Sequence, residues 1–99
     1  MNILNKLCVI VPEFPTGNGR VDLHIRCREH EGIIEVKSFR DITSLKHGKI
    51  QAAGYAKKLG IDKVVLVVFV HGVEEKEAEI LRDGRVIDGV RIITEPIVF

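Results

Sequence analysis

Residues 63–70 read Lys-Val-Val-Leu-Val-Val-Phe-Val, and this continuous β-branched run constrains the fold of the chain more than any other segment. Such a run is typical of a strand that is buried on both faces of a sheet. Residues 43–59, which precede it, have the spacing of an amphipathic helix. A strand that precedes this helix would complete a strand-helix-strand unit, whose right-handed crossover pairs its two strands in parallel.

The helix is expected from its apolar stripe and from the signals at its two ends. The stripe comprises Leu45, Ala52, Ala56 and Leu59. The candidate N-caps are Asp41, Thr43 and Ser44. Gly60 is the expected stop. A second face of the same helix carries His47, Gln51 and Tyr55, each four residues from the next.

A β-hairpin is expected before the helix. Residues 20–27 alternate between apolar and polar side chains, and residues 33–38 form a second short apolar segment beyond a polar turn at residues 28–32. If the loop has an even number of residues, Asp22 falls on the same face as Glu35 and Lys37. It then stands opposite Glu35 or Lys37, at roughly 5 Å between Cβ atoms.

These residues have the chemistry of a metal site for phosphodiester hydrolysis. Mg²⁺ prefers oxygen ligands and retains several waters, so one or two carboxylates are sufficient to hold it. Asp22 and Glu35 are the candidate ligands, with the backbone carbonyl of Val36 as a third oxygen. Lys37 projects from the same face as Glu35, where its ammonium would orient the attacking water or neutralise charge on the phosphate. For Asp22 the plainer interpretation is a solvated carboxylate, and for Glu35 with Lys37 it is a surface ion pair of little energetic value.

The spacing Gly-Arg-Val-Asp-Leu, then Ile-Ile-Glu-Val-Lys, then Gln-Ala-Ala-Gly-Tyr resembles the PD-(D/E)XK nuclease superfamily. Gln51 and Tyr55 are similar to the Gln-x-x-x-Tyr element of its RecB-like branch, and the whole of residues 19–70 is most similar to the nuclease-like domain appended to prokaryotic AAA-type ATPases. The resemblance gives Gln51 a place near the metal and phosphate and Tyr55 a supporting role. Without the resemblance, both residues belong to an ordinary amphipathic helix.

The resemblance implies a single α/β domain over residues 1–99 with a restriction-endonuclease-like mixed sheet. It also implies a Mg²⁺ or Mn²⁺ cofactor and a nuclease activity on DNA. The family usually begins with a helix that carries another acidic residue, whereas Pro12 and Pro15 interrupt this segment and only Glu13 stands in for the acid. Two alternatives therefore stay open: a non-catalytic regulatory or interaction module, and a small dimer that resembles Holliday-junction resolvases.

Charge and hydropathy limit the partners. The net charge of +1 gives no overall attraction to nucleic acid, so a phosphate-binding surface requires local clustering. The basic residues expected around the site are Arg20, Arg26, Arg28, Arg40, Lys46, Lys49, Lys57 and Lys58. His24 and His47 are secondary candidates for acid or phosphate-contact roles and are more typical of surface histidines. The mean hydropathy of +0.13 indicates a covered surface, in a homodimer or against a larger ATPase- or helicase-type partner.

The remaining segments give coarser expectations. Residues 7–11 are expected to form an edge strand or an extended lead-in, residues 12–19 a loop, and residues 90–94 a strand. Residues 74–81 fit either a helix or a strand, and the dipeptides Asp83-Gly84 and Asp88-Gly89 are expected turns within a β-rich tail. Cys8 and Cys27 are expected to be reduced, partly buried thiols rather than a single disulfide, which stays possible, in a prokaryotic, cytoplasmic protein without a membrane span.

Overall fold

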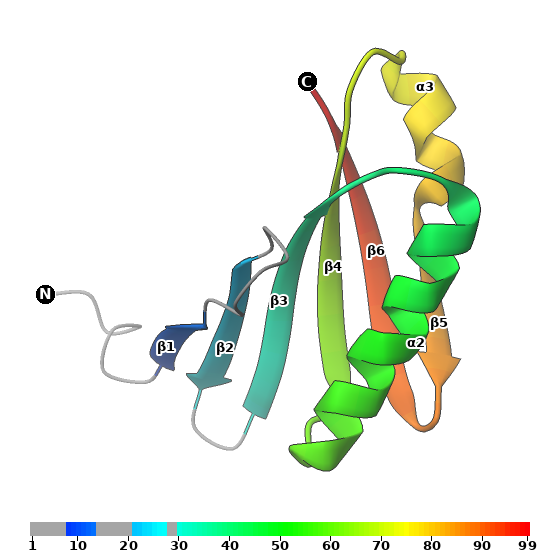
Figure 1. Cartoon of the computed structure of the whole chain (residues 1–99). Helices are drawn as coiled ribbons and strands as arrows, with labels where there is room; N and C mark the ends of the chain where they lie inside the picture. The colour runs from blue at the N-terminus through cyan, green and yellow to red at the C-terminus, as the bar shows by residue number, and fades with distance from the viewer. Residues whose placement is uncertain (1–7, 14–20, 28–29) are drawn as a thin grey trace, which may run out of the picture.

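The computed structural model describes residues 8–13, 21–27 and 30–99, which form an α/β fold around a six-stranded mixed sheet (Figure 1). The strand order is β1-β2-β3-β4-β6-β5. Strands β1 (Cys8–Glu13), β2 (Val21–Cys27) and β3 (His30–Ser38) form an antiparallel meander. Strands β3, β4 (Lys63–Val70) and β6 (Val90–Val98) are parallel, and β5 (Asp83–Ile87) closes the sheet antiparallel to β6.

Helix α2 (Ile42–Lys58) connects β3 to β4 and confirms the predicted strand-helix-strand unit. Asp41 is the N-cap, because its carboxylate accepts a hydrogen bond from the Ser44 amide at 2.7 Å. This bond is the main reason that the pKa of Asp41 lies below its ordinary value. Gly60 follows the helix with a φ of +73°, a left-handed conformation that favours glycine, as expected of the stop residue.

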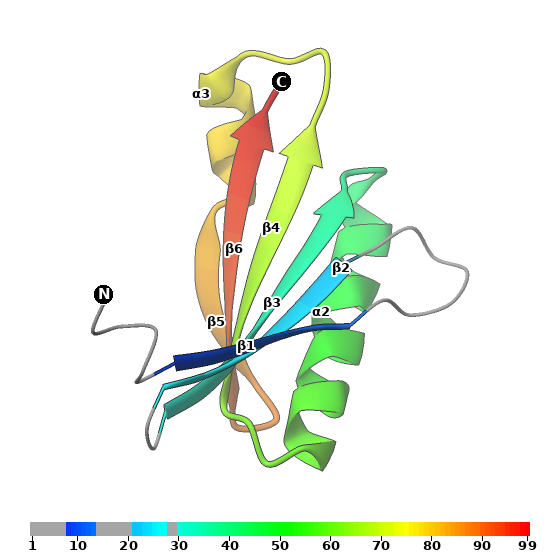
Figure 2. The same ribbon diagram turned by 90° about the vertical axis from the view of Figure 1, so that its left-hand side faces the viewer.

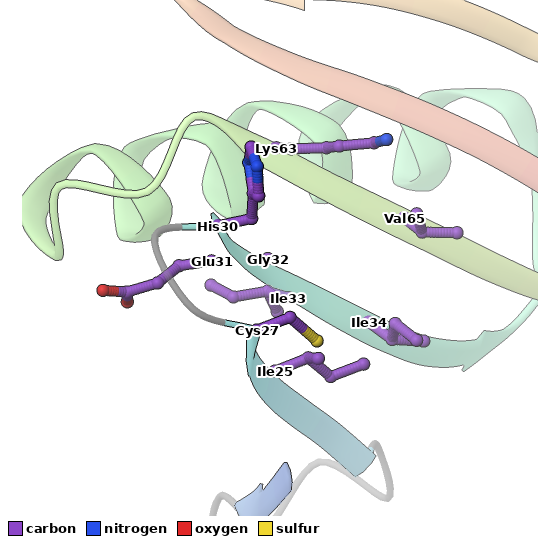
Figure 3. Close-up of a pocket in the computed structure, with 9 residues that line it drawn as sticks. All are labelled: Ile25, Cys27, His30, Glu31, Gly32, Ile33, Ile34, Lys63 and Val65. Carbon is purple, nitrogen blue, oxygen red and sulfur yellow. The ribbon is translucent and has the colours of Figure 1, made fainter. Parts of the chain in front are cut away.

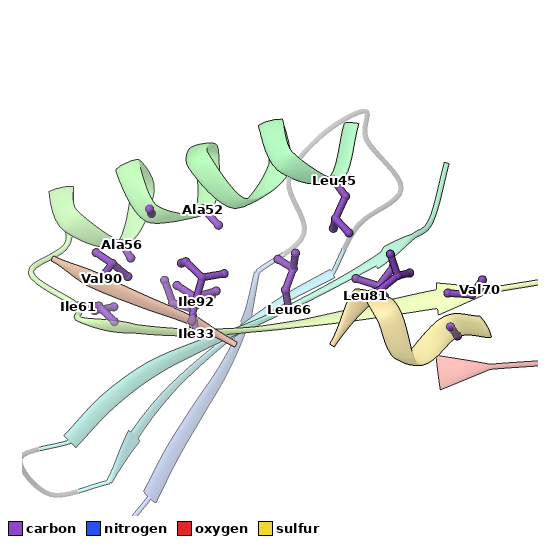
Figure 4. Close-up of a cluster of buried hydrophobic side chains, with 14 residues drawn as sticks. Ile33, Leu45, Ala52, Ala56, Ile61, Leu66, Val70, Leu81, Val90 and Ile92 are labelled. Atoms are coloured by element: carbon purple, nitrogen blue, oxygen red, sulfur yellow. The ribbon is translucent and has the colours of Figure 1, made fainter. Parts of the chain in front are cut away.

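The core lies between α2 and one face of the sheet (Figure 4). Ala53, Ala56, Leu66, Val68 and Ile92 are completely buried there. The small alanines let the helix approach the sheet closely, and the β-branched residues of the strands fill the space beneath. Figure 2 shows α2 along one side of the sheet.

The prediction that the strand of residues 63–70 is buried on both faces is wrong for one of its two faces. In β4, Val64, Leu66, Val68 and Val70 are buried, whereas Val65, Val67 and Phe69 are only half-buried. The alternation arises because successive side chains of a strand point to opposite faces and the helices pack on only one of these faces.

The tail confirms the β-rich expectation and settles residues 74–81 as helical. Helix α3 (Glu75–Ala78) and the 3-10 turn η1 (Glu79–Leu81) add Ala78 and Leu81 to the core. Asp88 and Gly89 form the expected hairpin turn, with φ values of 52° and 80°. Asp83-Gly84 is not a turn, because both residues lie in β5.

The first and third strands, β1 and β3, include residues that the turn-forming sequence predicted to lie in loops. β1 is an edge strand that continues through Pro12 to Glu13, positions expected in a loop, because proline is tolerated on an edge where its missing N–H faces no neighbour. β3 begins at His30 rather than after Gly32. The rest of the expected loop, residues 14–19, lies outside the described residues, as do Arg20, the expected first residue of the next strand, and Arg28 of the basic set.

The expectation of reduced thiols is wrong for Cys27, which is disulfide-bonded. The register of β1 and β2 places the Cα atoms of Cys8 and Cys27 opposite each other, within the range that a disulfide spans. The alternative of a single disulfide therefore holds, and the strand register that aligns the two cysteines is not visible in the sequence. In the part of the chain that the structure describes, no helix is long and apolar enough to cross a membrane.

Candidate functional site

The hairpin register brings the predicted carboxylate positions together. Asp22 in β2 is the direct partner of Glu35 in β3, the first of the two pairings that the hairpin left open, Glu35 or Lys37. Glu13 in β1 is in turn the partner of Asp22. Three acidic residues therefore occupy consecutive positions in one row across β1, β2 and β3.

Glu35 is 3% exposed and lies on the face of the sheet that α2 covers. Its neighbours on this face are Ile33 in the same strand and Leu66 at the equivalent position of β4, both buried in the core. A carboxylate is rarely buried at such a depth unless it is paired, hydrogen-bonded or bound to a metal. Its burial makes Glu35 the least ordinary residue of the predicted set.

Lys37 extends along the same face toward α2. Its Nζ atom lies against Gly48 so closely that a Cβ atom on Gly48 would overlap it, and the Lys37 Cε atom would lie 3.4 Å from that Cβ. Gly48 itself is buried. The missing side chain of Gly48 thus provides the space that the Lys37 ammonium occupies.

Gln51 and Tyr55 lie on the flank of α2 that faces β3. They follow Gly48 by three and seven positions, so all three residues share one side of the helix. The Lys37 ammonium contacts the helix at Gly48, so the side of α2 that carries Gly48, Gln51 and Tyr55 lies next to Lys37. Gln51 is exposed and the Tyr55 side chain is 43% exposed, so both reach the surface beside the row.

Val36 is the remaining predicted metal ligand. It lies in an interior strand between Val21 of β2 and Val67 of β4, so its carbonyl points along the sheet toward a neighbouring strand. Among the residues whose side chains are described, which do not include Asp22 or Glu13, no three His, Cys, Asp or Glu groups converge on one point. The assignment of a metal to Asp22, Glu35 and Val36 stays a prediction.

His24 has a partner that explains it without a catalytic role. Its Nε2 atom lies 3.0 Å from the Glu31 carboxylate. The same carboxylate forms an ion pair with Arg26, whose Nε atom lies 3.4 Å from Glu31 Oε1. His47 is exposed on α2. Among the described residues, no hydrogen bond or ion pair joins either histidine to Glu35 or Lys37.

Lys49 does not belong to the predicted basic surface. It is 8% exposed, and its Nζ atom donates to the Asp83 carboxylate in β5 at 2.9 Å. This pair lies beneath the opposite flank of α2 from Gly48, next to Thr94, the strand partner of Asp83. The helical period places Lys49 on the apolar stripe, four residues after Leu45 and three before Ala52, and only its charge suggested the surface.

Gly48 is the residue that sequence reasoning missed. A glycine inside a helix is costly, and one that persists there often marks a close contact. That signal was present at position 48 and also at Gly54, which has no atoms within 4 Å of its would-be Cβ. Only the structure separates the two glycines.

Comparison with protein-family models, curated proteins and solved structures finds no significant match to the chain. The family resemblance therefore rests on Asp22, Glu35, Lys37, Gln51 and Tyr55 and on the geometry that joins them.

Proposed function

We propose that this chain is a metal-dependent nuclease of the PD-(D/E)XK type that hydrolyses phosphodiester bonds of DNA. The observation that carries the proposal is the pairing of Asp22 with the buried Glu35, with Lys37 two residues further along the same face. Carboxylates on neighbouring strands can hold a cation that polarises a phosphodiester and activates a water, and a nearby lysine can offset negative charge on the phosphate.

The residues divide the chemistry among them. Mg²⁺ or Mn²⁺, when bound, would polarise the phosphate and lower the pKa of a water. Asp22, Glu35 and the Val36 carbonyl would hold the cation, since hard cations prefer oxygen ligands. Lys37 would orient the nucleophilic water and offset negative charge on the phosphate. Gln51 and Tyr55, at the surface beside the row, would contact the substrate and support Lys37.

The architecture supports a restriction-endonuclease-like assignment. The antiparallel meander β1-β2-β3 carries the acidic row, α2 crosses over, and β4 pairs in parallel with β3. This order puts Lys37 and the Gln51 flank of α2 on the same side of the sheet. The exposed cations Arg40 and Lys46, which lie at and near the start of α2, are available to backbone phosphates.

The test is cleavage of linear duplex, single-stranded and four-way-junction DNA by the purified chain in Mg²⁺ or Mn²⁺. Lys37→Ala should lower the cleavage rate by about 10² to 10⁴, the range for removal of a group that stabilises a transition state. Lys63→Ala is the matched control, because Lys63 is an exposed lysine of the neighbouring strand on the opposite face. Full activity of Lys37→Ala would refute the mechanism, and a preference for the junction would point to a resolvase-like substrate.

The burial of Glu35 favours a second candidate, a non-catalytic module. In that case Glu35 and Lys37 help α2 to pack on the sheet, and the domain binds a partner without hydrolysis. The two candidates differ in their response to metal. If the folded chain binds Mn²⁺ at a nuclease site, added Mn²⁺ stabilises the folded state and raises the melting temperature. If Glu35 serves only the packing of α2, added Mn²⁺ leaves the melting temperature unchanged.

A further inference from the structure

The sheet has a second apolar face, opposite α2. A row of four aliphatic side chains crosses it from β2 to β6, formed by Leu23, Ile34, Val65 and Ile93. Flanking positions of the same face add Ile25, Val36, Val67, Phe69 and Ile97. We call this surface the far face.

The far face has no covering layer among the described residues. Leu23, Ile34, Val65 and Ile93 are half-buried, whereas their neighbours one position along the same strands, Ile33, Val64 and Ile92, are 5% exposed or less. Parallel strands such as β3, β4 and β6 are normally covered on both faces. A contiguous apolar surface of this kind is typical of an interaction site.

The far face is also hollowed. A depression of about 240 Å³ lies over Gly32, where the absence of a side chain leaves a gap between Ile25, Ile34 and Val65 (Figure 3). Lys63 borders the depression. An aliphatic side chain from a partner would fill it.

Charges occur at the two ends of the far face rather than at its centre. Along β6, Arg91 precedes Ile93 by two residues and Glu95 follows it by two, so both lie on the far face at equal distances from the central row. Glu95 also pairs with Arg82 at the sheet edge. A two-fold axis along the central row would set Ile93 against its own copy and Arg91 against Glu95 of the second copy.

We propose that the far face binds a second copy of this chain in a two-fold sheet-on-sheet dimer. Aligned sheets pack about 10 Å apart through apolar faces, and a two-fold interface must be self-complementary. The far face meets this requirement through its uncharged centre, with Arg91 and Lys63 of β4 at one end and Glu95 at the other. Its four strands, about 4.8 Å apart and about 23 Å long, give roughly 440 Å² per copy, a total in the range of weak, reversible interfaces.

The first experiment is sedimentation velocity of the whole chain over a wide concentration range. The wild type should be a dimer. Val65→Lys places two ammonium groups on the two-fold axis and should raise the dimer dissociation constant by at least about a hundredfold, because an unpaired buried charge costs several kcal/mol. Ile80→Lys is the matched control, since Ile80 is 81% exposed in η1, away from the far face, and it should leave the dimer intact.

A second pair of variants keeps the proposal testable if Val65→Lys does not fold. In an Arg82→Gln background, which removes the competing partner of Glu95, Arg91→Glu should weaken the dimer and Arg91→Glu with Glu95→Arg should restore it. A wild type that stays monomeric at the highest attainable concentration overturns the proposal. So does a dimer that neither Val65→Lys nor Arg91→Glu weakens, because its interface would lie elsewhere.

Discussion

Gly48 links the stability of α2 to the position of the Lys37 ammonium. An interior helical glycine destabilises by roughly 0.5–1 kcal/mol relative to alanine. At Gly48 the missing Cβ leaves room for the Lys37 Nζ atom, whereas at Gly54 it leaves open space. The two glycines of the same helix therefore carry the same cost, and only one of them shapes the candidate site.

Gly48→Ala should separate folding from activity. The new Cβ would displace the flexible end of Lys37, so we expect a stability at or above that of the wild type and a cleavage rate lowered at least about tenfold, which corresponds to 1.4 kcal/mol of transition-state stabilisation. Gly54→Ala should give the same gain in helix stability, up to about 1 kcal/mol, with full activity. Chemical denaturation and cleavage assays on both variants check this.

The two parts of this expectation fail separately. If Lys37→Ala is inactive but Gly48→Ala is fully active, Lys37 does not depend on the space at Gly48. If both variants are fully active, the nuclease mechanism itself is wrong.

Asp41 gives a residue-scale prediction on pH. The hydrogen bond from the Ser44 amide lowers the pKa of Asp41 below its ordinary value of 3.8 in the folded state. Its contribution to stability is therefore complete above the unfolded-state pKa and is lost as the pH falls through the folded-state pKa. Asp41→Ala should melt below the wild type at pH 7, and the difference should shrink below about pH 4.

The control for this prediction is Thr43→Ala, which removes an exposed neighbouring side chain without removing the cap. Calorimetric melting curves from pH 3 to pH 7 measure the effect. A difference in melting temperature that stays constant over this range would show that the carboxylate does not supply the cap.

At the scale of elements, the Lys49 and Asp83 pair joins α2 to the edge strand β5. Lys49 is nearly buried, whereas the Asp83 side chain is 36% exposed, so solvent screens the pair in part. Among the described residues, the buried Asp83 Oδ1 and Thr94 Oγ1 atoms have no hydrogen-bond partner, although the two residues are direct strand partners.

Asp83→Asn should destabilise the domain by about 2 kcal/mol, because it leaves the Lys49 ammonium buried without a counter-charge. Lys49→Met combined with Asp83→Asn should cost less than the sum of the single changes, since the two residues interact. Urea denaturation of the three variants gives the coupling energy. Additive effects would mean that the pair contributes nothing to the docking of β5.

The elements themselves were largely predictable from local patterns. Period-two alternation identified β2, the cap and stop residues bounded α2 to within one residue, and Asp88-Gly89 marked its hairpin. The parity of the β2-β3 loop predicted the pairing of Asp22 with Glu35. The prediction of a turn at Asp83-Gly84 was wrong because this dipeptide can also lie in an edge strand. Here the hydrogen bond from Lys49 holds Asp83 in β5.

At the scale of the whole molecule, non-local pairings decided what the sequence did not. No local signal indicates that β6 inserts between β4 and β5, that β5 brings Asp83 beneath Lys49, or that β1 aligns Cys8 with Cys27. The far face was likewise hidden, because the valine run of β4 fits burial on one face as well as on both. The mean hydropathy of the chain predicted a surface covered by a partner, and that stays a prediction.

The paired acidic positions Asp22 and Glu35 are proposed to hold a divalent cation, and isothermal calorimetry with Mn²⁺ measures that binding. We predict that the wild type binds Mn²⁺ and that Asp22→Ala and Glu35→Ala each abolish binding while retaining the circular dichroism spectrum of the fold. Glu31→Ala is the control, because Glu31 lies in the same hairpin but is engaged by His24 and Arg26, and it should bind as the wild type does. A folded wild type that binds no Mn²⁺, or binding that survives both substitutions, would contradict the account.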